Sequence, residues 1–97
     1  MRLPLYCSTA KGTEPNLVGL QHPALSSLPT QLVCPLRSDI SLTPIREKIR
    51  IAGQAYVVAC DLLRPINRKT LRPMGELDPE TSARINATFQ LILAQED

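Results

Sequence analysis

The chain contains 97 residues, of which 43% are hydrophobic and 21% are charged, and its formal net charge is +2. This length suits one modest hydrophobic core, so we expect a single domain over residues 1–97, and the composition argues against wholesale disorder. No stretch approaches the roughly 18 consecutive apolar residues of a membrane-spanning helix, and the N-terminal residues lack the long apolar segment of a secretory signal. We therefore expect a soluble cytoplasmic protein.

The aromatic and proline contents limit the fold further. The chain has no Trp, two Tyr and one Phe, so its core must be built from aliphatic side chains. The same scarcity argues against a protein that binds single strands by stacking bases on aromatic rings. Nine prolines speak against an all-helical bundle, because each removes a backbone donor and fixes one backbone dihedral.

Three strands are predicted in the first part of the chain. Residues 3–7 form a short apolar strand, and a loop over residues 8–15 leads to a second strand at residues 16–21. Within that strand, Gly19 marks a bulge or a close approach of the backbone. Residues 30–36 form the third strand, and Pro35 places it at a sheet edge or marks its end.

A β-hairpin gives the clearest local signal. Residues 47–51 alternate between polar and apolar, Ala52-Gly53 supply a turn, and residues 54–60 form an apolar run typical of a buried strand. The segment from Arg64-Pro65 to Arg72-Pro73 is predicted as a basic loop, with at most a short strand around Thr70-Leu71.

One helix is predicted, at the C-terminal end. Asp78 caps its free amides, Pro79 occupies the first helical position, and Glu80 favours the positive end of the helix dipole. A broad apolar stripe should pack on a sheet; its members are Ala83, Ile85, Ala87, Phe89, Leu91 and Ile92. The predicted fold class is α+β and mainly β: a small twisted antiparallel sheet or SH3-like barrel with one C-terminal helix.

The cysteines predict neither a metal site nor a disulfide framework. Cys7, Cys34 and Cys60 are far apart in the sequence and include no close pair of the C-x-x-C kind. We expect buried thiols that behave as small hydrophobes. A catalytic Cys–His pair would have to use His22, the one histidine, which precedes Pro23 in a turn-like stretch. No metal and no cofactor is predicted.

Positive charge is concentrated in the middle of the chain. Residues 37–72 contain eight basic and three acidic residues, a net charge of +5, whereas the rest of the chain is negative. Such a segment suits an acidic partner, either a nucleic acid or an acidic polypeptide, although a solvated basic face is the simpler alternative.

Two runs of sequence resemble known toxin families. Residues 15–21, 25–28, 31–36 and 49–58, with Ile85-Asn86-Ala87 in the helix, resemble the CcdB family. Residues 60–71, which begin Cys60-Asp61 and continue to Arg64, followed by Gly75-Glu76-Leu77, resemble the MazF/PemK family. The resemblance implies a shared barrel-like fold, a homodimer, and the toxin half of a type II toxin–antitoxin pair. It also implies an acidic antitoxin, which we expect to bind the face that carries Arg64, Arg68, Lys69 and Arg72.

The resemblance to CcdB implies inhibition of DNA gyrase. That family binds the gyrase A subunit through the end of its C-terminal helix, where Leu93, Ala94 and Gln95 stand in this chain instead of the family's Gly-Ile terminus. Because the CcdB-like match covers residues 15–36, where the ribonuclease signature is missing, a CcdB-like gyrase inhibitor is the main interpretation.

The resemblance to MazF implies an endoribonuclease as the alternative. That family places an Arg-Pro at the start of its second strand and a Thr after its third. This chain has Glu14-Pro15 and Arg37-Ser38 there, and a carboxylate repels phosphate. A rearranged catalytic site would comprise Arg37, Ser38, Asp61 and Arg64, with the two arginines as phosphate clamps. Otherwise Asp61 pairs with Arg64 and orders the loop. A third interpretation is a relative that binds an antitoxin but has no cellular target.

Overall fold

The computed structural model describes residues 2–8, 12–20, 28–38 and 46–94. Its seven strands are β1 (Pro4–Cys7), β2 (Leu17–Gly19), β3 (Thr30–Arg37), β4 (Arg46–Ile51), β5 (Gln54–Ala59), β6 (Arg64–Asn67) and β7 (Arg72–Glu76). Two short 3-10 helices, η2 (Cys60–Leu62) and η3 (Arg68–Thr70), flank β6, and the helix α1 (Pro79–Ala94) follows β7. The mainly β architecture with one C-terminal helix is the predicted fold class.

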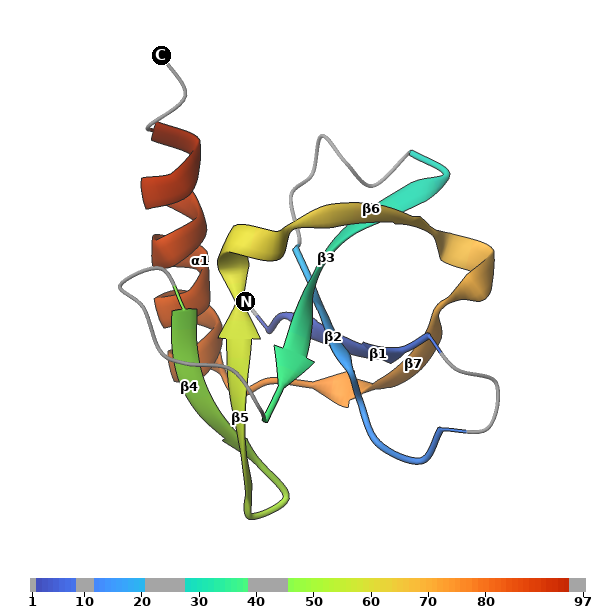
Figure 1. Cartoon of the computed structure of the whole chain (residues 1–97), viewed down its shortest axis with the longest axis horizontal. Coiled ribbons are helices and arrows are strands. Elements are labelled where there is room, and N and C mark those ends of the chain that lie inside the picture. The colour runs from blue at the N-terminus through green and yellow to red at the C-terminus, as the bar shows by residue number, and fades with distance from the viewer. Residues whose placement is uncertain (1, 9–11, 21–27, 39–45, 95–97) are drawn as a thin grey trace.

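The strands form one curled antiparallel sheet in the order β4-β5-β3-β2-β1-β7, and β6 pairs with β3 outside this path. Successive strands β6 and β7 therefore attach to different parts of the sheet: β6 to β3 and β7 to β1. Figure 1 shows that η3 carries the chain from one to the other on the side of the molecule opposite α1. The result is a half-barrel.

Pro35 lies inside the central strand β3, where its lack of an amide proton is harmless. The amide of Leu36 donates to the carbonyl of Asn16 on the β2 side, at 2.8 Å. Because amides alternate between the two edges of a strand, the missing donor of Pro35 falls on the opposite edge. There β6 pairs with β3 only as far as Val33, and β5 begins to pair at Leu36. The predicted edge position was wrong for the strand, but Pro35 does mark a gap between two partners.

The segment predicted as a basic loop forms β6, η3 and β7 instead. The Asn67 side chain accepts a hydrogen bond from the amide of Lys69 at 3.0 Å, and Thr70 Oγ1 donates to the Asn67 carbonyl at 2.8 Å. These bonds hold η3 as a turn, so the expected strand at Thr70-Leu71 is absent from this described segment. Pairing with β3 and β1 is what makes the flanking residues extended, and short-range sequence signals do not report it.

The predicted hairpin is confirmed. Strands β4 and β5 pair from Arg46 with Ala59 to Ile51 with Gln54. The two residues between them, Ala52 and Gly53, have positive φ angles of 52° and 83°. Positive φ at both central positions is the signature of the tight turn whose twist matches a hairpin.

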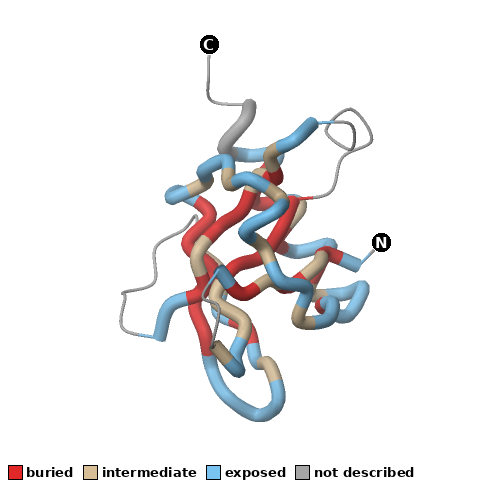
Figure 2. Tube along the Cα trace, turned by 90° about the vertical axis from the view of Figure 1, so that its right-hand side faces the viewer, coloured by how far each residue is buried: buried red, intermediate tan, exposed pale blue. Residues whose placement is uncertain are grey.

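The main core lies between the sheet and α1. Figure 2 shows the buried stretches running through the middle of the molecule, while the tip of the β4–β5 hairpin is exposed. The core cluster comprises Leu3, Leu5, Val18, Leu20, Cys34, Leu36, Ile49, Tyr56, Val58, Cys60, Leu77, Ile85 and Phe89. All three cysteines are buried thiols, as predicted. A hydrogen bond with Cys60, together with burial, raises the pKa of Cys34, so this thiol stays protonated.

The start of α1 is as predicted, but its buried face is only partly so. Asp78 Oδ2 accepts a hydrogen bond from the amide of Thr81 at 3.0 Å, and hydrogen bonding to Thr81 lowers the pKa of Asp78. Ile85 and Phe89 are buried, together with the polar Ser82 and Thr88. The expected contribution of Ala83, Ala87 and Leu91 to the buried stripe was wrong, since all three are exposed. The side chain of Ile92 lies outside the described residues.

No helix among the described residues combines the length and apolar character needed to cross a membrane.

Candidate functional site

The four residues of the predicted ribonuclease site are spread over the sheet. Asp61, in η2, forms a two-bonded ion pair with Arg46 on β4, with Nε to Oδ1 at 2.9 Å and Nη2 to Oδ2 at 3.0 Å. This hydrogen bonding to Arg46 lowers the pKa of Asp61. The register that pairs Arg46 with Ala59 brings Arg46 beside η2. The expected pair between Asp61 and Arg64 is therefore contradicted.

Arg37 and Ser38 diverge because they are neighbours at the end of a strand. Arg37 pairs with Val57 of β5, and successive side chains of a strand point to opposite faces. Leu36 and Ser38 both line the pocket described below, whereas Arg37 does not. Of the predicted set, Ser38 lines this pocket, whereas Arg37, Asp61 and Arg64 are not among its described lining residues.

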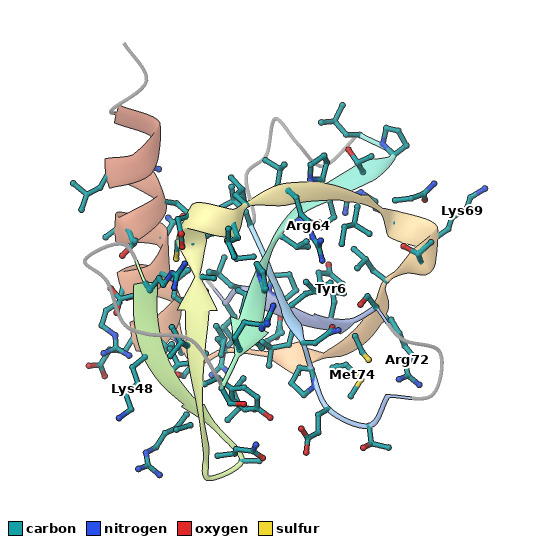
Figure 3. The ribbon with its side chains drawn as sticks, in the orientation of Figure 1. Tyr6, Lys48, Arg64, Lys69, Arg72 and Met74 are labelled. Atoms are coloured by element: carbon teal, nitrogen blue, oxygen red, sulfur yellow. The ribbon has the colours of Figure 1, made fainter. Side chains whose placement is uncertain are left out.

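Arg64 and Tyr6 share the face of the sheet that points away from the core cluster. Arg64 pairs with Val33, and Val33 pairs with Gly19, so these three positions are direct neighbours on one face. The Tyr6 ring lies over Gly19: its Cε2 would be 2.7 Å from a Cβ built there. Figure 3 shows Tyr6 and Arg64 between β6 and β1, away from Lys48, which projects from β4. We call this surface the Tyr6 face.

Tyr6 and Arg64 are both available to a ligand. Tyr6 is half-buried and Arg64 is exposed, and neither side chain has a hydrogen-bond or ion-pair partner among the described residues. The low aromatic content suggested that no ring would be placed for base stacking. One of the two tyrosines nevertheless lies on the same face as an exposed cation, and nothing in the local sequence signalled this.

Arg68 and Lys69 border the Tyr6 face but differ in role. The guanidinium of Arg68 donates to the carbonyl of Leu28 and to Oε1 of buried Gln31, each at 2.8 Å. Gln31 in turn donates to the carbonyl of Leu20 at 2.6 Å. Arg68 thus fixes η3 to the sheet, whereas Lys69 beside it is exposed and projects outward (Figure 3).

A pocket of about 370 Å³ opens where the loop before β2 meets the end of β3 and the start of β5. It is lined by Cys7, Gly12, Thr13, Glu14, Pro15, Asn16, Leu36, Ser38, Gln54 and Tyr56. Glu14-Pro15 and Ser38 occupy the two places where the MazF family has its Arg-Pro and Thr, and the fold brings them together. The contributions of Gln54 and Tyr56 were missed, because the local sequence of a hairpin strand does not indicate whether its residues line a pocket.

The Glu14 carboxylate sets the electrostatics of this pocket. The hydroxyl of Tyr56 donates to Glu14 Oε2 at 3.3 Å. Burial raises the pKa of Tyr56, and the charge of Glu14 adds to the effect, so the phenol remains a donor at neutral pH. Among the described lining residues, Glu14 is the one formally charged side chain.

Arg72 connects the basic segment to the pocket. Its guanidinium donates to the carbonyl of Gly12, which lines the pocket. The register that pairs Arg72 with Cys7, another lining residue, puts the start of β7 beside this wall. A positive charge therefore stands at the rim of a pocket whose interior carries a carboxylate.

The residues expected to bind gyrase are described only in part. Leu93 and Ala94 form the last turn of α1, without described side chains, and Gln95 lies outside the described residues, as does His22. Their predicted role remains a prediction.

The sequence matches no protein-family model and no curated protein, but the structure is similar to solved structures. It is similar to a chain of an endoribonuclease in complex with its cognate antitoxin from a mycobacterial species, with a TM-score of 0.74 and 16% identity over 98% of this chain and 94% of that chain. Two crystal forms of MazE–MazF from Deinococcus radiodurans give TM-scores of 0.66 and 0.67 at 15% and 16% identity. They cover 95% and 96% of this chain, and 89% and 92% of those chains. The chain has a MazF-like fold.

Proposed function

We propose that this chain is the toxin of a type II toxin–antitoxin pair and acts on RNA as an endoribonuclease. The similarity to an endoribonuclease bound to its antitoxin supports this function, because it extends over nearly the whole of both chains. The neighbours described above are named as an endoribonuclease and as MazE–MazF, and none as a gyrase inhibitor. We therefore prefer the ribonuclease alternative to the CcdB-like interpretation.

The observation that carries the RNA target is that Tyr6 and Arg64 lie on the same face of the sheet. An aromatic ring stacks any base, and a guanidinium binds phosphate oxygens through two parallel hydrogen bonds. Two strand separations of about 5 Å divide the backbone of Arg64 from that of Gly19, over which the ring lies, so one short RNA segment can reach both side chains. Lys69 supplies a further charge at the border of the Tyr6 face. In this proposal Arg64 is the phosphate clamp.

The antitoxin is proposed to bind the same cations. An acidic segment that orders on Arg64 and Lys69 would cover the Tyr6 face and exclude RNA by competition. Arg68 also belongs to the set of residues predicted to bind the antitoxin, but its hydrogen bonds to Leu28 and Gln31 give it a structural role. Charge reversal at Arg68 would therefore confuse folding with binding, whereas Arg64→Glu with Lys69→Glu tests binding alone.

The experiment measures binding and cleavage of single-stranded RNA by the purified chain. Arg64→Ala should weaken binding on every sequence and reduce the salt slope by about 1, as expected for one lost phosphate contact. Tyr6→Leu should weaken binding by about 1–3 kcal/mol, and Tyr6→Phe, which keeps the ring, should restore it. Lys48→Ala is the matched control, because Lys48 is an exposed cation on β4, away from Tyr6 and Arg64 (Figure 3).

Absence of RNA binding and cleavage would refute this function. Expression of the chain without an antitoxin provides the second arm. Cleaved transcripts are the expected result, gyrase-linked DNA breaks would restore the CcdB-like interpretation, and unaffected growth would favour a relative without a cellular target.

A further inference from the structure

The Glu14 pocket combines one carboxylate with neutral polar groups that have spare hydrogen-bonding capacity. Tyr56 occupies only one lone pair of Glu14 Oε2, so the carboxylate can still accept at least two hydrogen bonds. Thr13, Ser38 and Gln54 also line the pocket, and their side chains make no hydrogen bond with any other described residue. Asn16 is different, because its amide is engaged with Ser8 on both sides, at 3.0 Å and 2.9 Å.

This chemistry disfavours a phosphate group, which has only acceptors and a negative charge, because Glu14 repels it. A guanidinium or ammonium group has only donors, so it fits in part: it can donate to the oxygens of Glu14, Ser38 and Gln54 but cannot use the hydroxyl and amide donors. The pocket suits a neutral ligand that presents two adjacent donors next to an acceptor. Its volume of about 370 Å³ lies at the small end of ligand pockets, as expected for a single planar group.

We propose that the Glu14 pocket binds a guanine base of single-stranded RNA, an inference that rests on the proposed RNA target. The Watson–Crick edge of guanine presents N1–H and N2–H₂ side by side, which a carboxylate accepts together, and O6 next to them accepts from a neutral donor. Adenine and cytosine each offer one exocyclic amine beside a ring acceptor, and uracil offers one N–H between two carbonyls. Only guanine satisfies both Glu14 oxygens at once.

Arg72 supports the assignment from outside the pocket. A base that enters the pocket carries its ribose and phosphate at the rim, where the guanidinium of Arg72 is held against Gly12. Arg72 is thus assigned to the phosphate and Glu14 to the base. This division agrees with the general rule that phosphate contacts position a nucleic acid and base contacts specify its sequence. Glu14 and Arg72 act here as specificity and positioning residues rather than as catalytic ones.

The test measures equilibrium binding of the full chain to hexamers of sequence UUXUUU, in which X is G, A, C or inosine. A 2′-O-methyl group on every ribose prevents attack by a 2′-oxygen at any position, so binding is separated from cleavage. Guanine should bind best, and inosine, which lacks only the N2 amine, should bind about tenfold more weakly because one hydrogen bond to a charged acceptor is lost. Glu14→Gln should weaken the G hexamer about tenfold or more and the inosine hexamer less. Glu76→Gln, an identical change at an exposed residue that does not line the pocket, should alter neither.

The outcomes separate this inference from the proposed function. Equal binding of all hexamers, unchanged in Glu14→Gln, would overturn the guanine pocket and leave the RNA target standing. Failure of every hexamer to bind would overturn both. In a parallel titration followed by NMR, guanosine should perturb the amides of the pocket, whereas perturbation by L-arginine and not by guanosine would show a cation pocket and refute the assignment.

Discussion

The hydroxyl of Ser82 attaches α1 to the residue that precedes β1. Its Oγ accepts a hydrogen bond from the amide of Leu3 at 2.9 Å, and both residues are fully buried. Ser82→Ala deletes the acceptor and leaves the Leu3 amide without a partner in a site that water does not reach. An unsatisfied buried donor costs about 1–3 kcal/mol, while the better helix propensity of Ala returns roughly 0.5 kcal/mol. We expect a net loss of about 1–2 kcal/mol.

For a domain of this size, that loss corresponds to a fall in Tm of about 4–8 °C per kcal/mol. Urea unfolding followed by circular dichroism provides the free energy of unfolding. The slope of this free energy against urea concentration should not change. Asn86→Ala is the matched control, because it gains similar helix propensity and the Asn86 side chain makes no hydrogen bond with the described residues. If Ser82→Ala proved as stable as Asn86→Ala, the Leu3–Ser82 bond would not be what holds α1 in place.

Three further changes test the turn, a strand contact and the Asp61 ion pair. Ala52→Asn should stabilise the chain by roughly 0.5–1 kcal/mol in urea unfolding, since Asn tolerates the positive φ of 52° better than Ala, and a loss would contradict the turn geometry. Gly19→Ala should destabilise by about 1–3 kcal/mol, because its Cβ would lie 2.7 Å from Tyr6 Cε2, and the cost should shrink in a Tyr6→Ala background. Arg46 lowers the pKa of Asp61 in the folded state, so its contribution is present above the ordinary Asp pKa of about 3.9 and is lost as pH falls through the lower, folded value. The urea midpoint should therefore fall more between pH 5 and pH 2 for the wild type than for Asp61→Asn, and equal falls would refute the pairing.

Elements specified by nearby residues were predictable from the sequence. The Asp78 cap and the turn at Ala52-Gly53 each depend on the conformation of a few consecutive residues, and the structure confirms both. The hairpin follows from its turn and from period-two alternation. These signals also sufficed for the fold class, because a helix on a small antiparallel sheet is one of few ways to bury such elements.

Strands β6 and β7 escaped prediction because tertiary pairing creates them. Neither β6 nor β7 contains a fully buried residue, so no alternation of apolar and polar residues marked them. The buried face of α1 was misjudged for a related reason. Ser82 and Thr88 are polar and yet buried, since Leu3 donates to the first and the second donates to Glu47 at 3.0 Å. A prediction that assigns every polar residue to solvent therefore places the buried face of the helix on the wrong side.

The candidate site was only partly predictable, because, of the predicted catalytic set, Ser38 lines the pocket, whereas Arg37, Asp61 and Arg64 are not among its described lining residues. Family resemblance placed Glu14 and Ser38 at matching positions, and both line one pocket. From the sequence, Glu14 was interpreted as a residue that weakens a phosphate site, because its neighbours in space were not known. Its partner Tyr56 lies 42 residues away in sequence, and only the fold shows that the carboxylate is set among neutral donors.

The Tyr6 face carries cations and the Glu14 pocket carries a carboxylate, so in the proposed function RNA and the antitoxin have different binding sites. An acidic segment gains from Arg64 and Lys69 but is repelled by Glu14, so it has no reason to enter the pocket. RNA gains from both, because its phosphates meet the cations while a neutral base meets the carboxylate. Competition for the Tyr6 face is then enough for inhibition, and the pocket is left to distinguish one RNA sequence from another. A carboxylate that would weaken a phosphate site thereby contributes selectivity, because it excludes the acidic partner from the place where the base is read.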